Sequence, residues 1–254
     1  MPPDRTPRAV RRPLRDDGDR GIRARLHPRM AGRLRDTVAT GRVRDRMRLF
    51  GMRMSGNCWK AGQILRLTEH KFDWVETDGN AGATRTPEFL AINPIGKVPT
   101  LVLDDGTVLA ESNAILLHYA EGTPWLPPPG LARTRVHEWL FFEQYSHEPY
   151  IAVARNLIAW RHEAHLYPDR LAECSVRGAQ ALDVMERRLV ANPWLVGEAP
   201  TIADLALFAY THRADEAGFD LARWPGVLAW VGRITSLPGI TTLPRPEPVE
   251  AASD

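Results

Sequence analysis

The chain has 254 residues, of which 44% are hydrophobic and 25% charged, and its formal net charge at pH 7 is +2. This length and composition suit one large or two ordinary globular domains and exclude a fibrous protein. No apolar run approaches the roughly 20 residues that span a bilayer and no secretory leader is recognisable, so we expect a soluble cytoplasmic protein without a membrane partner.

The charge is divided unevenly along the chain. Residues 1–45 contain 13 Arg, no Lys and 6 Asp, a net charge of +7, whereas the other residues carry 20 basic and 25 acidic side chains, a net charge of −5. The first part has no aromatic residue and no sustained apolar periodicity, so we predict a disordered Arg-rich extension. A nucleic-acid-binding arm or a transit peptide would fit the arginines. The six Asp and the missing aromatics favour an inert tail upstream of a start near Met47, and no nucleic-acid partner.

The segment from residue 46 to residue 121 alternates strand and helix patterns. Strands are predicted at 47–52, 72–78, 100–105 and 107–110, and helices at 57–70, 86–94 and 112–121. Asn57 and Ser112 are the expected N-caps of the first and last helices. The order βαβαββα on one mixed sheet is typical of a thioredoxin-like domain.

The rest of the chain has no strand pattern. The proline-rich stretch GTPWLPPPG, residues 122–130, predicts a semi-rigid linker. Residues 131–240 follow with helical spacing at 132–160, 170–190, 201–218 and 225–240, so the predicted fold class is α/β plus all-α. In TIAD, Thr201–Asp204, the spacing is that of a capping box at the start of a buried helix, which predicts a role in folding. Residues 241–254 are predicted to be a disordered tail.

The cysteines and histidines give no sign of a metal site. Cys58 and Cys174 lie far apart, with no clustered ligand at metal-binding spacing, so we expect neither a disulfide framework nor a metal. The stretch HEAH, His162–His165, lacks the HExxH spacing that places two ligands on one helix face. The free thiols favour a reducing compartment.

Two stretches together resemble the cytosolic glutathione S-transferases. They are NPIGKVPTLVLDDGTVLAESNAILLHYAEGTPWLP, which begins at Asn93, and WLVGEAPTIADLALFAY, which begins at Trp194. SGNCWK, residues 55–60, looks like the bacterial theta- or nu-like branches of that family. The resemblance covers roughly residues 47–240. It implies a glutathione-binding domain over 46–121, a helical substrate-binding domain over 131–240, and a homodimer with glutathione as co-substrate.

The resemblance assigns Lys97, Val98 and Pro99 to glutathione. It implies a cis Val98–Pro99 bond, so that the backbone N–H and C=O of Val98 lie outside the ladder and can pair with the cysteinyl part of the peptide like an added strand. Lys97 would reach the glycyl carboxylate. An edge-strand proline and a solvated surface lysine are the alternatives.

Glu111 and Ser112 lie at the boundary between the last strand and the last helix of the first domain. A helix N-terminus offers N–H groups and a positive dipole end to a carboxylate, Ser112 adds a hydroxyl, and Glu111 can pair with an α-ammonium. Together they fit the γ-glutamyl end of glutathione. An ordinary helix cap would explain Ser112 without Glu111.

Ser55 and Asn57 lie between the first strand and the first helix, where a hydroxyl, an amide and a helix N-terminus are expected to meet. By the resemblance, Ser55 is the predicted catalytic residue that stabilises the glutathione thiolate, and Asn57 is the second candidate; a turn and N-cap would be the alternative. Cys58 is the rival, because some relatives of this fold use a protein cysteine, although it has no CxxC partner.

The predicted function is therefore a glutathione transferase that conjugates glutathione to a small electrophile or uses it to reduce small disulfides or peroxides. Both reactions begin with a positioned glutathione thiolate. The alternative is a non-catalytic glutathione-binding or partner-binding protein of the same fold.

Overall fold

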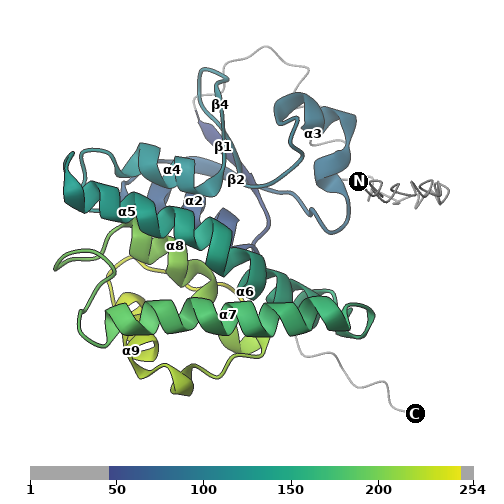
Figure 1. The fold of residues 1–254 in the computed structure, drawn as a ribbon. Coiled ribbons are helices and arrows are strands. Elements are labelled where there is room, and N and C mark those ends of the chain that lie inside the picture. Colours follow the sequence, from purple (N-terminus) through teal and green to yellow (C-terminus); the bar gives the residue numbers. More distant parts are fainter. Residues whose placement is uncertain (1–45, 247–254) are drawn as a thin grey trace, which may run out of the picture.

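The computed structural model describes residues 46–246, and the predictions for residues 1–45 and 247–254 lie outside this range. Its sheet domain lies above its helical domain in Figure 1. The elements of the sheet domain are strands β1 (Met47–Gly51), β2 (Phe72–Glu76), β3 (Thr100–Val102) and β4 (Val108–Ala110), and helices α2 (Gly56–Leu67), α3 (Pro87–Ile92) and α4 (Ser112–Ala120). The predicted βαβαββα order is confirmed, with a short 3₁₀ turn, Ala83–Arg85, added before α3.

The four strands form one mixed sheet in the order β2-β1-β3-β4, in which β1 is parallel to β2 and β3 is antiparallel to both β1 and β4. Side chains of successive residues point to opposite faces of a strand. Leu49 and Leu101 accordingly join the large core beneath α2 and α4. Phe50 and Val102 pack on the other face against Phe89 of α3. The sheet is thus covered on both faces, which is the thioredoxin-like arrangement.

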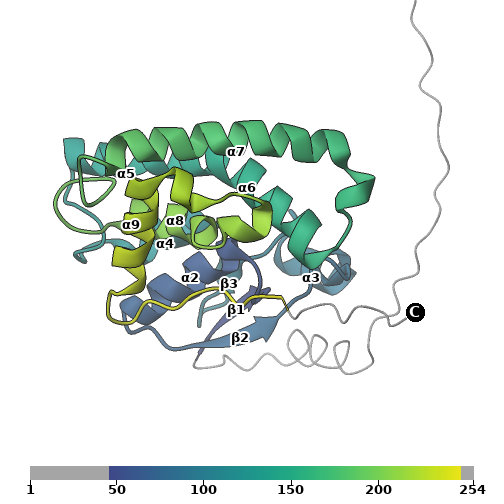
Figure 2. The same cartoon turned by 90° about the horizontal axis from the view of Figure 1, so that it is seen from below.

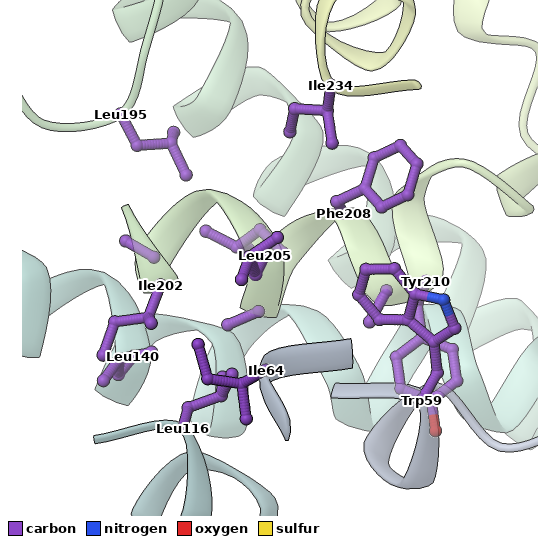
Figure 3. Packing of buried hydrophobic residues seen from close by; sticks show 14 of the residues in the cluster. Trp59, Ile64, Leu116, Leu140, Leu195, Ile202, Leu205, Phe208, Tyr210 and Ile234 are labelled. Carbon is purple, nitrogen blue, oxygen red and sulfur yellow. The ribbon is translucent and has the colours of Figure 1, made fainter. Parts of the chain in front are cut away.

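The helical domain consists of α5 (Leu131–Phe142), α6 (Glu148–Arg155), α7 (Pro168–Leu189), α8 (Ile202–Thr211) and α9 (Pro225–Thr235). Every residue of α8 is buried, so this helix has no solvent face. In Figure 3 its side chains lie between those of the sheet domain and those of the other helices. The labelled side chains come from α2 (Trp59 and Ile64), α4 (Leu116), α5 (Leu140), the segment before α8 (Leu195), α8 (Ile202, Leu205, Phe208 and Tyr210) and α9 (Ile234). One apolar core therefore joins the two domains.

The predicted capping box at the start of α8 is confirmed. The Thr201 hydroxyl accepts from the backbone N–H of Ala203 at 3.2 Å, and the Asp204 carboxylate accepts from the backbone N–H of Thr201 at 2.8 Å. Asp204 also accepts from the backbone N–H of Leu195 and from Trp230 Nε1. This buried carboxylate thus connects three parts of the helical domain.

The single helix predicted over residues 132–160 is divided in the structure. Helix α5 passes into a π-helical turn, Glu143–His147, and α6 passes into a second one, Asn156–Trp160. Pro149 lies in the first turn of α6, where its missing N–H is tolerated, and the wider turn before it accommodates the interruption. Gln144 of the first π-helical turn and Leu157 and Trp160 of the second line cavities that also border the sheet domain.

The disordered tail predicted from residue 241 differs from the structure for residues 241–246. Leu243 is 1% exposed, and its backbone N–H donates to Nε2 of His212 at 2.9 Å. Trp59 Nε1 donates to the carbonyl of Thr241 at 3.2 Å. Figure 2 shows this segment, in yellow, running beside α2. Leu243 anchors this segment in the core, and the segment both donates and accepts hydrogen bonds. It has no apolar periodicity from which its order could be predicted.

Helices long and apolar enough to cross a membrane are absent from residues 46–246.

Candidate active site

Two adjoining cavities lie where the sheet domain meets the helical domain. The larger has a volume of about 460 Å³ and reaches the second π-helical turn, and the smaller has about 100 Å³ and reaches the N-terminus of α4. The two cavities share the lining residues Asn57, Lys97, Val98 and Glu148. All the site residues selected from the sequence line one or both cavities: Ser55, Asn57, Lys97, Val98, Pro99, Glu111 and Ser112.

Ser55 is the N-cap of α2, and its hydroxyl oxygen accepts from the backbone N–H of Cys58 at 3.3 Å. The sequence predicts Asn57 as the cap, and this is wrong by two residues. Ser55 has the extended backbone, φ −85° and ψ 123°, that a capping residue needs, whereas Asn57 already lies in the first turn. The amide of Asn57 is consequently available for other partners.

The side chain of Asn57 links three helices. Its Nδ2 donates to Oε1 of Glu148 at 3.2 Å, and its Oδ1 accepts from the hydroxyl of Ser112 at 3.2 Å. Its backbone N–H donates to the hydroxyl of Tyr210 at 3.3 Å. The start of α2 is therefore held by α4 from its own domain and by α6 and α8 from the helical domain.

Tyr210 of α8 lies directly against the first residue of α2. A Cβ atom at Gly56 would come within 2.7 Å of the Tyr210 ring, so only glycine allows this approach. Tyr210 is 6% exposed, and burial raises the pKa of its hydroxyl, which stays protonated at neutral pH. It can therefore serve the site as a neutral hydrogen-bonding group.

The segment before β3 leaves the backbone of Val98 unpaired. The Val98–Pro99 bond is cis and the strand begins only at Thr100, so the Val98 N–H and C=O have no partner among residues 46–246. Asn93 fixes this segment, because its Nδ2 donates to the carbonyl of Lys97 at 3.0 Å and to the Thr100 hydroxyl at 2.8 Å. The Lys97 side chain itself is exposed at the rim.

At the start of α4 the backbone adopts an uncommon conformation. Glu111 has φ 67° and ψ 116°, although a residue with a Cβ atom rarely takes a positive φ. Such strain concentrates at ligand-binding sites. Ser112, predicted as the N-cap, is instead the first residue of α4, and Glu111 is the N-cap without a side-chain cap bond. Ser112 is 4% exposed, and its hydroxyl is already directed at Asn57. The exposed Glu111 side chain lines the smaller cavity, as Asn57 does.

Cys58, the rival for the chemistry, is fully buried. Burial raises the pKa of its thiol to about 11, and this outweighs the lowering effect of its contact with Ser55. A thiol exchanges with disulfides as its thiolate, and it must also be accessible. Cys58 meets neither condition.

A buried ion pair lies beneath the cavities. Lys60 Nζ of α2 is 2.7 Å from Oε1 of Glu143, and both side chains are fully buried. Asn113 of α4 connects the pair, since its Oδ1 accepts from Lys60 at 3.3 Å and its Nδ2 donates to Glu143 Oε2 at 3.0 Å. The three residues fasten α2 and α4 to the first π-helical turn.

Comparison with known proteins identifies the family. The family model "Glutathione S-transferase, N-terminal domain" matches residues 45–121, and the model "Glutathione S-transferase, C-terminal domain" matches residues 168–233. Glutathione S-transferase 3 of Zea mays is 30% identical over 225 residues, a match that covers 82% of this chain and 99% of the maize protein. The chain belongs to the glutathione S-transferase family.

Solved glutathione S-transferases share the fold. A glutathione S-transferase from Xanthobacter autotrophicus Py2 is 72% identical, with a TM-score of 0.77 over 78% of this chain and 97% of that one. A structure of Ure2p in complex with glutathione is 26% identical, with a TM-score of 0.71 over 82% of this chain and 96% of that one.

Curated relatives also include the URE2 proteins of Eremothecium gossypii and Saccharomyces cerevisiae, the latter named "Transcriptional regulator URE2". Each is 28% identical over 232 residues, which cover 76% of this chain and 66% of the URE2 protein. The chain thus spans slightly less than two thirds of the length of these relatives.

Three residues of this glutathione S-transferase cleft were missed from the sequence: Glu148, Arg155 and Tyr210. Arg155 is 2% exposed; its Nη1 donates to the carbonyl of Met54 at 2.6 Å and its Nε pairs with Glu216 at 2.7 Å. It fastens the loop before Ser55 to the helical domain. The proline after Glu148, which marks the start of a helix, was the available signal for that residue.

Within the described part of the chain, no group of three or more His, Cys, Asp or Glu side chains is arranged to hold a metal ion.

Proposed function

We propose that the protein is a glutathione transferase, in which Ser55 and Asn57 stabilise the thiolate of bound glutathione for attack on a small electrophile, disulfide or peroxide. The observation that carries this proposal is the position of both residues at the N-terminus of α2, where the smaller cavity adjoins the larger. A peptide in the smaller cavity would present its sulfur at this junction.

Glutathione is proposed to bind by its backbone and by both ends. The unpaired N–H and C=O of Val98 can pair with the cysteinyl part of the peptide, next to Pro99. The backbone N–H of Ser112 and the others at the N-terminus of α4 suit the γ-glutamyl carboxylate, while the Ser112 hydroxyl stays on Asn57. Glu111 suits the α-ammonium, and Lys97 suits the glycyl carboxylate. The solved complex of Ure2p with glutathione, a relative of the same fold, supports this ligand.

The larger cavity is proposed to hold the second substrate. Its lining combines apolar and sulfur-containing side chains with a similar share of polar and charged ones, which suits a small electrophile that has both an apolar and a polar part. Among its members are Met52, Met54, Val153, Leu157 and Trp160.

Approximate magnitudes show how much of the rate acceleration each of the two cavities can supply. Lowering the pKa of a thiol from ~8.5 by about 2 units raises the thiolate fraction at pH 7 about 25-fold. The lower basicity reduces its nucleophilicity by roughly 6- to 10-fold, so the net gain is only about 3-fold. Most of the acceleration must therefore come from holding the electrophile against the sulfur.

The test is the pH dependence of kcat/KM for conjugation of glutathione to a generic aryl halide, in wild type, Ser55→Ala and Asn57→Ala. We expect each variant to lose about 3-fold at pH 7 and to equal or exceed wild type above about pH 9, where glutathione ionises without help and the more basic thiolate is the better nucleophile. A parallel assay with a small mixed disulfide reports the reductase activity. Variants that match wild type at every pH in both assays would show that these residues do not activate the thiol.

The second candidate function is a non-catalytic glutathione-binding or partner-binding protein. It is favoured by one observation, the similarity to a protein named as a transcriptional regulator. Calorimetric titration with glutathione separates the two candidates. Binding without turnover of an aryl halide, a mixed disulfide or a hydroperoxide would support the second.

The protein is also proposed to be cytoplasmic and to belong to the bacterial theta- or nu-like branch of the family. Its proposed oligomeric state is a homodimer. Phe141 is 74% exposed and Tyr145 is 83% exposed, both at the C-terminal end of α5 and the turn after it. Exposed aromatic side chains are typical of an interface. Sedimentation equilibrium should give twice the chain mass, and Phe141→Glu should shift it toward the mass of one chain.

A further inference from the structure

The amide of Asn57 can act on a thiolate only if its nitrogen, and not its oxygen, faces the junction of the cavities. Its two side-chain partners, Ser112 and Glu148, differ in which atom of the amide each of them can bind. The hydroxyl of Ser112 can donate or accept, so it is compatible with either orientation of the amide. An ionised carboxylate can only accept, so Glu148 requires Nδ2 on its side. Glu148 alone therefore decides which way the amide points.

Hydrogen-bond counting shows what remains for a ligand. The Asn57 nitrogen carries two N–H groups, of which one donates to Glu148 at 3.2 Å. The second has no partner among the residues that the structure describes, and Asn57 and Glu148 line both cavities. We propose that Glu148 is a positioning residue: its carboxylate fixes the Asn57 amide so that the second Nδ2–H donates to the sulfur of glutathione. This inference rests on the proposed function.

The surroundings of Glu148 set the pH range in which its ionised carboxylate can orient the Asn57 amide. Burial raises the pKa of its carboxyl, and Glu143 nearby raises it further, while Lys60, the hydrogen bond from Asn57 and Lys97 lower it. Tyr210 on α8 also faces it and is neutral. Below this raised pKa the carboxyl carries a proton that it can donate to the amide oxygen, and the orientation of the amide is no longer specified.

The isosteric variant Glu148→Gln distinguishes a positioning role from a purely electrostatic one, because the two roles predict opposite changes in the pKa of the bound thiol. Removing a negative charge near a thiolate favours the thiolate, so a purely electrostatic role predicts a lower pKa for the bound thiol. A glutamine can donate to the Asn57 oxygen and release the nitrogen, so the positioning role predicts a higher thiol pKa, by about 1 unit for the loss of one hydrogen bond to a charged group.

The experiment follows thiolate formation in bound glutathione by its ultraviolet absorbance as a function of pH. It compares wild type, Glu148→Gln, Asn57→Ala and Asn57→Ala/Glu148→Gln. The charge control is Glu138→Gln, because Glu138 of α5 is exposed and lines neither of the two cavities. We expect the thiol pKa to rise in Glu148→Gln and in Asn57→Ala. In the Asn57→Ala background the second change should lower it or leave it unchanged, because only the electrostatic effect remains.

The inference is overturned if Glu148→Gln lowers the thiol pKa or leaves it at the wild-type value. It is also overturned if Glu148→Gln raises the thiol pKa equally in the Asn57→Ala background, or if Asn57→Ala alone leaves the thiol pKa unchanged. Urea unfolding of each variant shows whether a change reflects loss of structure. If Ser55→Ala raises the thiol pKa while Glu148→Gln does not, the inference fails and the proposed function stands. If wild type does not bind glutathione, both fall.

Discussion

Burial decides the chemistry of Cys58, one residue from the proposed thiol-binding group. The start of a helix favours a thiolate, and the backbone N–H of Cys58 lies at the cap where such stabilisation operates. Its side chain nevertheless points into the core, and desolvation raises the pKa of its thiol to about 11. At pH 7 this leaves roughly one thiolate in ten thousand molecules. Two neighbouring positions thus have opposite roles, since Asn57 faces the cavities and Cys58 faces the sheet.

We predict that Cys58→Ala keeps its kcat/KM for an aryl halide within about twofold of wild type, while unfolding with a free energy lower by about 1 kcal/mol because a small buried side chain is lost. The native protein should also react slowly with a disulfide reagent and quickly in urea. Loss of activity without loss of structure would restore Cys58 as a candidate.

The sequence predicted the residues near Val98 and the two helix N-termini, because each has a local signal: a proline at a strand entrance, or a polar residue before a helix. It did not single out Glu148, whose following proline indicates only a helix start, or Tyr210. These two reach the site only through the packing of α6 and α8 against α2, and the inward face of a fully buried helix such as α8 cannot be read from its apolar pattern.

At the scale of elements, caps and wide turns determine where the helices begin and which residues they direct into the cleft. The strand and helix order of the first domain was predictable because alternation, helical spacing and turn residues agree along that part of the chain. The π-helical turns within the segment 132–160 were not predictable, because one extra residue in a helical turn does not change the amino-acid composition recognisably. These turns shift the register of every later residue in that helix, Glu148 included.

The capping box of α8 gives a prediction at this scale. Replacing Thr201 by Ala removes the cap oxygen and should lower the free energy of unfolding by about 1 kcal/mol, whereas Thr201→Ser should cost less than half of that. Replacing Asp204 by Ala leaves the buried donors of Leu195 and Trp230 without an acceptor and should cost more, about 3 kcal/mol. Urea denaturation followed by tryptophan fluorescence measures all three. An equal loss in the alanine and serine variants of Thr201 would contradict a capping role.

At the scale of the whole molecule, two buried histidines connect stability to pH. Nε2 of His147 lies 2.8 Å from the Thr211 hydroxyl, which itself donates to a carbonyl, so the histidine must donate and its Nδ1 has no partner among the described residues. Nδ1 of His212 donates to the carbonyl of Phe208, and its Nε2 accepts from the backbone N–H of Leu243. The His212 arrangement requires a neutral ring, because its Nε2 must accept. His147 has no acceptor for a second proton on Nδ1 among the described residues. Burial lowers the pKa of each to about 4.

The sign of the pH effect follows from these values. The unfolded chain binds protons on both histidines near pH 6.5, and the folded chain does so only near pH 4, so stability is complete above about pH 6.5 and falls as the pH drops toward 4. The loss can reach on the order of 3 kcal/mol for each ring. Urea unfolding at intervals between pH 7.5 and pH 4 should show this slope. His212→Gln should make this slope shallower, whereas His118→Gln, at an exposed position, should leave it unchanged. Equal slopes in wild type and both variants would contradict the predicted role of His212.

The contact of Asn57 with Glu148 and Tyr210 has a consequence for how this protein can be divided. The helical domain supplies acceptors and a packing surface to the very turn that is proposed to hold the sulfur. A fragment that ends in the linker at residue 130 would keep Val98, Glu111 and Ser112 but would lose both groups. A chimera carrying the helical domain of a relative would exchange them together with the electrophile cavity. Thiol reactivity and choice of electrophile would then be inherited as a unit, so recombination at the linker would alter both at once.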